Sequence, residues 1–266
     1  MYRRTIGILL MVISVGGLTV YGQAAPATPP AASQSTTPAA SPAPPTAAPE
    51  VKAPAVPSAQ EMALLKQKAL AGDVAAQNKL GQVYALGQGV PRNLVEAEKW
   101  FHKAADQGDA AAQMKLGLMY MGGLGVVADP KAAVGGYKKA AAQDSLEAML
   151  QLGNLYESGR GVSKSGPEAV NWYSKAAQKG NVQAELKLGD IYRSGLEDVP
   201  HDYEQALKWY RKAAQQGSGA AEFYIGYMYQ QGLGVVASVD DAAQWYSKAV
   251  QDNYPSAKVA LRNLQR

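Results

Sequence analysis

The sequence predicts an all-α protein, built as a solenoid of five helix-pair repeats with a half-repeat helix at each end. A glycine-rich turn and, further on, an aromatic pair follow most copies of a recurring motif, and potential helix caps recur in step with it. The motif is Leu-Gly-x-x-Tyr or a close variant, spaced by 36, 36, 36 and 37 residues, and its copies start at Leu80, Leu116, Leu152, Leu188 and Ile225. A fixed period in this range indicates a stack of small units, each of which buries its apolar face against its neighbours.

Residues 1–24 have the features of a secretory signal peptide. Arg3 and Arg4 supply positive charge ahead of an apolar run of 15 residues, 6–20, which is short for a membrane span. We therefore expect a periplasmic or secreted protein. An inner-membrane anchor formed by residues 6–20 is the alternative.

Residues 25–57 predict a disordered linker. The segment consists mostly of Ala, Pro, Ser and Thr, and ten of the chain's 15 prolines lie in it. Such a composition has no apolar periodicity and cannot bury a core. The linker is either a tether that lets the domain work away from a membrane or a plain spacer.

Residues 58–266 form the repeat domain, with repeats 73–108, 109–144, 145–180, 181–217 and 218–253. Each repeat contains two helices, and every helix start carries a residue that favours the N-cap position. The caps of the first helices are Asp73, Asp109, Ser145, Asn181 and Ser218, and those of the second helices are Asn93, Asp129, Ser165, Asp202 and Ser238. Three residues after four of the second caps, an acidic or amide side chain predicts a capping box or a close relative: Glu96, Glu168, Gln205 and Asp241.

Glycines end the first helix of each repeat, as Gly87 and Gly89 do in the first one. The fourth repeat has an extra residue, which predicts a larger turn at 196–201. Residues 59–71 resemble a lone second helix, and 255–264 resemble a lone first helix. A polar end helix is what a solenoid terminus needs.

Aromatic pairs lie midway along four second helices and predict core packing between neighbouring repeats: Trp100–Phe101, Trp172–Tyr173, Trp209–Tyr210 and Trp245–Tyr246. The second repeat departs from this pattern with Gly135 and Gly136. Adjacent glycines weaken a helix, so they predict a soft joint or a slot where another backbone comes close.

Composition excludes several classes of chemistry. The chain has no cysteine and two histidines, and its formal charge of +4 falls to +2 without Arg3 and Arg4, too little to suggest nucleic acid. It contains no nucleophile elbow, no S-x-x-K motif and no H-E-x-x-H motif. We therefore expect no enzyme activity, cofactor, metal site, small-molecule substrate or nucleic-acid partner.

The face of each first helix opposite its core residues predicts a partner-binding groove. At 100° per residue, two stripes of side chains lie on this face. One stripe contains Lys79, Lys115, Gln151, Lys187 and Tyr224, and the other contains Gln82, Leu118, Asn154, Asp190 and Tyr227. The lysines either receive acidic groups of a partner or form a solvated face. Tyr224 and Tyr227 are either interface anchors or pack against 255–264.

The fourth repeat carries the clearest resemblance to a known family. Its strings NVQAELKLGDIYRSG and DYEQALKWYRKAAQQG resemble the Sel-one-like repeat, a relative of the tetratricopeptide repeat, over about residues 58–266. The resemblance implies a right-handed α-solenoid that acts as a scaffold for protein partners, and for exported bacterial members it implies partners associated with the cell wall. A modulator of a peptidoglycan enzyme is the alternative. A cell-wall or β-lactam hydrolase is a weaker one, because the cysteines of that branch are missing.

Overall fold

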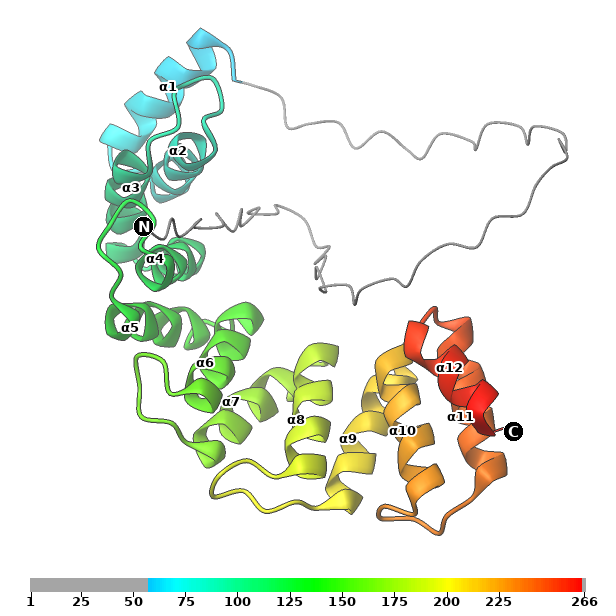
Figure 1. Ribbon diagram of the computed structural model, residues 1–266. Helices are drawn as coiled ribbons and strands as arrows, with labels where there is room; N and C mark the ends of the chain where they lie inside the picture. Colours follow the sequence, from blue (N-terminus) through cyan, green and yellow to red (C-terminus); the bar gives the residue numbers. More distant parts are fainter. Residues whose placement is uncertain (1–56, 265–266) are drawn as a thin grey trace, which may run out of the picture. The chain divides into compact units, whose positions relative to one another are not determined.

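The described part of the chain is a stack of helices that follow one another in sequence order. The computed structural model describes residues 57–264. Its helices are α1 (Ala59–Leu70), α2 (Val74–Leu86), α3 (Leu94–Asp106), α4 (Ala110–Gly122), α5 (Pro130–Ala141), α6 (Leu146–Ser158), α7 (Gly166–Gln178), α8 (Val182–Ser194), α9 (Tyr203–Gln215), α10 (Gly219–Gln231), α11 (Val239–Gln251) and α12 (Pro255–Leu264). Each helix packs chiefly against the one before and the one after it (Figure 1). The predicted all-α solenoid is confirmed.

The five repeats are the pairs α2–α3, α4–α5, α6–α7, α8–α9 and α10–α11, with α1 and α12 as the half-repeats. None of the helices within residues 57–264 has the length and apolar character needed to cross a membrane. The predicted signal peptide (1–24), its alternative as an anchor (6–20) and nearly all of the predicted linker (25–57) lie outside the described residues.

All ten predicted N-caps are confirmed. Each side chain accepts a hydrogen bond from the backbone N–H three residues further on, as in the 2.7 Å bond from Ala76 N to Asp73 Oδ1. The reciprocal capping boxes, in contrast, do not follow the prediction. Within the described residues the reciprocal pair is found at Ser58 and Glu61 of α1, whereas Glu96 turns away from its cap to pair with Lys99 at 2.6 Å.

The turns inside the repeats also follow the prediction. Gly87 ends α2 with φ 71°, in the left-handed region that favours glycine. The fourth repeat has the expected larger turn, in which Leu196 and Val199 exchange two backbone hydrogen bonds of 2.8 Å.

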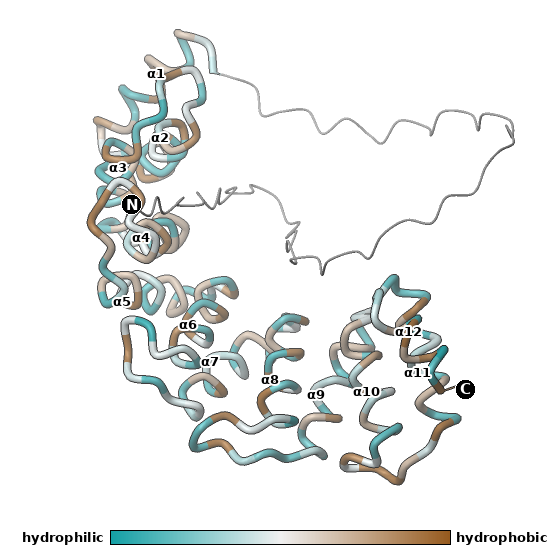
Figure 2. The backbone as a smooth tube through the Cα atoms, viewed as in Figure 1, coloured by the Kyte–Doolittle hydropathy of each residue, from teal (hydrophilic) through white to brown (hydrophobic). Residues whose placement is uncertain are grey.

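The core of each repeat contains one buried ring, set against the glycine of the paired first helix. The pairs are Gly81–Phe101, Gly117–Tyr137, Gly153–Tyr173, Gly189–Tyr210 and Gly226–Tyr246. All five rings are at most 3% exposed. The recurring glycine is therefore needed because a Cβ there would overlap the ring. Because each repeat has its own core, apolar residues recur on every helix of the stack instead of forming one central block (Figure 2).

The predicted core packing of the aromatic pairs is confirmed, but the two members of each pair are buried to different extents. Trp100, Trp172, Trp209 and Trp245 are only half-buried. A lysine three residues further on lies over each ring, with Nζ 4.1–4.3 Å from the ring centroid. The second member of each pair faces the glycine of its own repeat, and the tryptophan, 100° away around the helix, packs at the edge of the core.

The two adjacent glycines of the second repeat lie within a continuous helix, α5. A Cβ on Gly135 would meet open space, but one on Gly136 would lie 3.0 Å from the backbone oxygen of Gln113 in α4. The predicted close approach of another backbone is thus confirmed at Gly136. The soft joint stays a prediction.

Candidate functional site

The ten residues expected to bind a partner all lie on first helices, in a row that runs from α2 to α10. We call this row the first-helix face. Lys79, Asn154 and Tyr227 are exposed, and the other seven are partly buried: Gln82, Lys115, Leu118, Gln151, Lys187, Asp190 and Tyr224. The difference arises because most of them already have partners within the protein.

Asn78, a residue that the two stripes did not include, links the first two repeats. It is 7% exposed, and its Nδ2 donates to Asp109 Oδ1 at 2.7 Å. Its Oδ1 accepts from Gln82 Nε2 at 3.0 Å and from Lys115 Nζ at 3.3 Å. Burial lowers the pKa of Lys115. Lys115 therefore acts mainly as a bridge between α2 and α4, not as a free cation.

The third repeat carries an acidic centre. The hydroxyl of Tyr173, from α7, lies 2.7 Å from both Asn154 Oδ1 and Glu157 Oε2 of α6. Lys187 of α8 forms an ion pair with Glu157 at 3.3 Å. The predicted residues Asn154 and Lys187 are thus brought together through Glu157, which the sequence analysis did not single out.

The fourth repeat carries a polar and aromatic cluster around Tyr210. Its hydroxyl donates to Asp190 Oδ1 at 2.7 Å and accepts from Arg193 Nε at 3.1 Å. The ring of Tyr224, from α10, stacks on Tyr210 with centroids 5.3 Å apart, and Arg193 lies 5.1 Å from its centre. Burial raises the pKa of Tyr210 well above its ordinary range. These contacts hold Asp190 and Arg193 in fixed orientations at the surface.

The two tyrosines of the fifth repeat differ in their availability. Tyr224 packs against Tyr210 and Arg193, so its burial comes from the preceding repeat and not chiefly from 255–264. Tyr227 is 36% exposed. Of the two predicted anchors, Tyr227 is the one that offers ring surface to a partner.

The second repeat interrupts the polar row. Leu118 and Met121 occupy the positions at which the third repeat has Asn154 and Glu157. The hydroxyl of Tyr137 is consequently buried with no hydrogen-bond partner among the described residues, and burial raises its pKa. The first-helix face therefore offers a lysine and amides first, then an apolar step, then acidic groups, then an arginine beside exposed aromatic surface.

The polar groups of this face are mostly fixed by contacts within the protein. They occur in all five repeats, with an apolar interruption at Leu118 and Met121, and the buried Tyr173 and Tyr210 hold several of them in place. Asn78, Glu157 and Arg193 were missed by the sequence analysis because it considered each helix face separately. A spacing signal was available for the last two, since each lies one helical turn after a residue of the second stripe.

Comparisons with known proteins agree with this architecture. The Sel1 repeat profile matches residues 74–109, 110–145, 146–181, 182–218 and 219–254. No curated protein gives a match. Proteins of the matched family generally act as scaffolds for protein–protein interaction and are generally not enzymes.

Two solved structures are similar in sequence as well as in fold. One is c5321, described as a protective antigen present in uropathogenic Escherichia coli strains with an SLR fold; it is 39% identical with a TM-score of 0.70. The alignment covers 76% of this chain and only 43% of that one. The other is a Sel1 repeat protein from Oxalobacter formigenes, 34% identical with a TM-score of 0.68, covering 74% of this chain and 81% of that one. Because five Sel1 repeats match and these two relatives are similar in sequence and fold, the chain belongs to the Sel1 repeat family.

Proposed function

We propose that this protein is an exported adaptor that holds a segment of a partner protein along the first-helix face. The family's general role as a scaffold supports the binding of a protein partner. We choose this face because of one cluster on it, formed by Asp190, Arg193, Tyr210 and Tyr224. It presents a fixed carboxylate and guanidinium against Tyr224 of α10, a helix that also carries the exposed ring of Tyr227.

The chemistry of the face suggests what the partner segment contains. Lys79 is exposed at one end and would receive a carboxylate, whereas Leu118 and Met121 would contact an apolar side chain. Arg193 and Asp190 would form hydrogen bonds with a polar group of the segment near the other end of the face. Buried, well-packed anchors such as tyrosine and arginine dominate the binding energy of many protein interfaces.

Export is supported by the sequence features of residues 1–24 and the proline-rich segment that follows. The description of the similar Escherichia coli protein as an antigen agrees with a location outside the cytoplasm. Sequencing the N-terminus of the protein recovered by osmotic shock tests this part. A mature start near residue 25 supports export, and an intact Met1 in the membrane fraction supports the anchor formed by residues 6–20.

The binding role is tested with the full chain as bait and two variants of the face, Tyr227→Ala and Lys79→Ala. A partner that co-purifies with the wild-type chain should be retained less by both variants. The loss at Lys79 should depend on salt and the loss at Tyr227 should not, because only the first removes a charge. A partner retained equally by all three proteins would move the binding surface elsewhere.

A further inference from the structure

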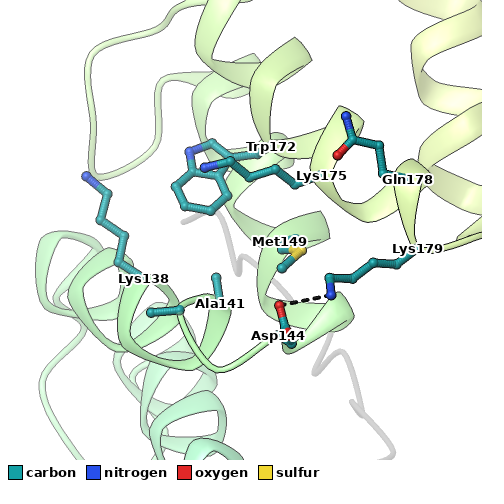
Figure 3. A pocket seen from close by; sticks show the side chains of 9 residues that line it. Lys138, Ala141, Asp144, Met149, Trp172, Lys175, Gln178 and Lys179 are labelled. Atoms are coloured by element: carbon teal, nitrogen blue, oxygen red, sulfur yellow. Dashed lines mark ion pairs between the residues drawn. The ribbon is translucent and has the colours of Figure 1, made fainter.

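A second candidate binding site lies on the opposite layer of the stack, between α5 and α7. It is a depression of about 460 Å³, within the size range of ligand pockets. Figure 3 shows its lining, with Met149 of α6 among the side chains of α5 and α7. The polar residues around it are Lys138, Asp144, Trp172, Lys175, Gln178 and Lys179.

Three departures from the repeat pattern coincide at this depression. The first is Asp144, which adopts φ 66° in a turn where four of the equivalent positions have glycine at φ 78–96°, Gly72, Gly108, Gly180 and Gly217, and the fifth repeat has Asn253 at φ 57°. A left-handed conformation disfavours a non-glycine residue, and such residues concentrate at functional sites. The aspartate at this position makes a contact that glycine could not make, because Asp144 forms an ion pair with Lys179 at 2.9 Å.

The second departure is Met149, and the third is Lys179. In the other four repeats the position of Met149 holds a buried Gln or Glu: Gln77, Gln113, Glu185 and Glu222. In three of them a hydrogen bond of 2.8–3.0 Å connects this residue to a glutamine after the second helix: Gln107, Gln143 and Gln216. In the third repeat that glutamine is replaced by Lys179, and Met149 cannot bond to it. These two replacements leave an apolar side chain, Met149, at the bottom of the depression and a lysine, Lys179, that pairs with Asp144.

The charge at the rim is unbalanced. Lys179 is neutralised by Asp144, but within residues 57–264 neither Lys138 nor Lys175 has a carboxylate within 4.0 Å. Lys175 lies over the ring of Trp172, with Nζ 4.1 Å from its centre. The Nε1–H of Trp172 is buried beneath this surface and has no acceptor among the described residues.

We infer that this depression binds an acidic peptide segment of a protein partner. A carboxylate of the segment lies between Lys138 and Lys175, and a neighbouring apolar side chain rests on Met149 and the aliphatic part of α5. Asp144 competes for Lys179 with that carboxylate. This site is separate from the first-helix face, so the two can be tested independently.

The test uses the full chain, labelled with ¹⁵N, and a capped peptide, Gly-Asp-Leu-Glu-Phe-Asp-Gly. The chain has four tryptophans, and Trp172→Phe identifies the indole signal of that residue. The acidic peptide should shift the Trp172 indole signal to saturation and leave the other three nearly unchanged. Its neutral counterpart, Gly-Asn-Leu-Gln-Phe-Asn-Gly, should bind about tenfold more weakly, because it lacks the two ion pairs with the exposed Lys138 and Lys175. Equal binding of both peptides, or no shift at Trp172, overturns the inference.

Matched variants sharpen the test. The double variant K138Q/K175Q should weaken binding of the acidic peptide about tenfold, whereas R211Q/K248Q, at the equivalent positions of the fourth and fifth repeats, should leave it unchanged. Asp144→Gly should strengthen binding about threefold because it frees Lys179, and it introduces the glycine that most equivalent turns have. All variants are first checked for an unchanged helical circular dichroism spectrum and melt. Weaker binding by Asp144→Gly, or unchanged binding by K138Q/K175Q, contradicts the site. A concentration-dependent dimer in sedimentation that K138Q/K175Q abolishes would assign the depression to a second copy of the chain instead.

Discussion

Gly81 of α2 lies against the ring of Phe101 of α3, and a Cβ at this position would lie 2.6 Å from Cδ1 of that ring. Phe101 is 3% exposed and packs against its own repeat and the next one. It therefore has little room to move away. The same relationship between glycine and ring recurs in all five repeats, so the helix pair depends on it.

Gly81→Ala should destabilise the protein by about 2 kcal/mol, because the added methyl overpacks a fixed ring. Gly135→Ala is the matched control, since a Cβ there meets open space in the middle of α5. It should stabilise the protein by about 0.5–1 kcal/mol through the higher helix propensity of alanine. Urea unfolding followed by circular dichroism measures both. Equal effects of the two substitutions would contradict the packing described.

Tyr137→Phe should stabilise the protein by about 1 kcal/mol, because it removes a buried hydroxyl that has no partner among the described residues. The first repeat already has Phe101 at this position. Tyr210→Phe should have the opposite effect and cost about 1 kcal/mol, since it removes the bonds to Asp190 and Arg193. Thermal unfolding of the two variants side by side is the measurement, and a loss of stability in Tyr137→Phe would count against the unpaired hydroxyl.

Glu185→Gln should change how stability depends on pH. Glu185 is 4% exposed, and burial raises its pKa although Gln216 donates to it at 2.8 Å. With a raised pKa the folded state binds more protons than the unfolded one, so the free energy of unfolding falls as pH rises from the ordinary glutamate value, about 4.3, through the raised pKa. Glutamine stands at this position in the first two repeats and has no such proton to lose.

The expected result is a Glu185→Gln variant that is about 1 kcal/mol more stable than the wild type at pH 7. Its advantage should disappear below the ordinary glutamate pKa, where Glu185 is protonated in both states. Glu204→Gln, at an exposed position of α9, is the control. Parallel pH profiles for the wild type and Glu185→Gln would show that Glu185 is not held in a buried setting.

Much of the fold could be predicted because its determinants are local. An N-cap such as Asp73 acts on a backbone N–H three residues away, and Gly87 acts through its own φ angle. Which member of each aromatic pair lies against the glycine was harder to predict, because periodicity alone does not say whether Trp100 or Phe101 faces Gly81.

The candidate site was predictable in its position but not in its contacts. The helical period placed Lys115 and Tyr224 on the first-helix face. It did not show that Lys115 bonds to Asn78, 37 residues earlier, or that Tyr224 stacks on Tyr210 from another helix. Such contacts depend on how neighbouring repeats pack, which no single repeat specifies.

The proposal that the first-helix face binds the partner is tested most directly by photo-crosslinking. A benzoylphenylalanine residue replaces Tyr227 in one full-length protein and the exposed Glu204 of the second helix α9 in another, and each is irradiated in the cells that produce it. We predict a discrete crosslinked product from position 227 that is absent or much weaker from position 204. The reverse result, with the product at position 204 and none at 227, would contradict the account.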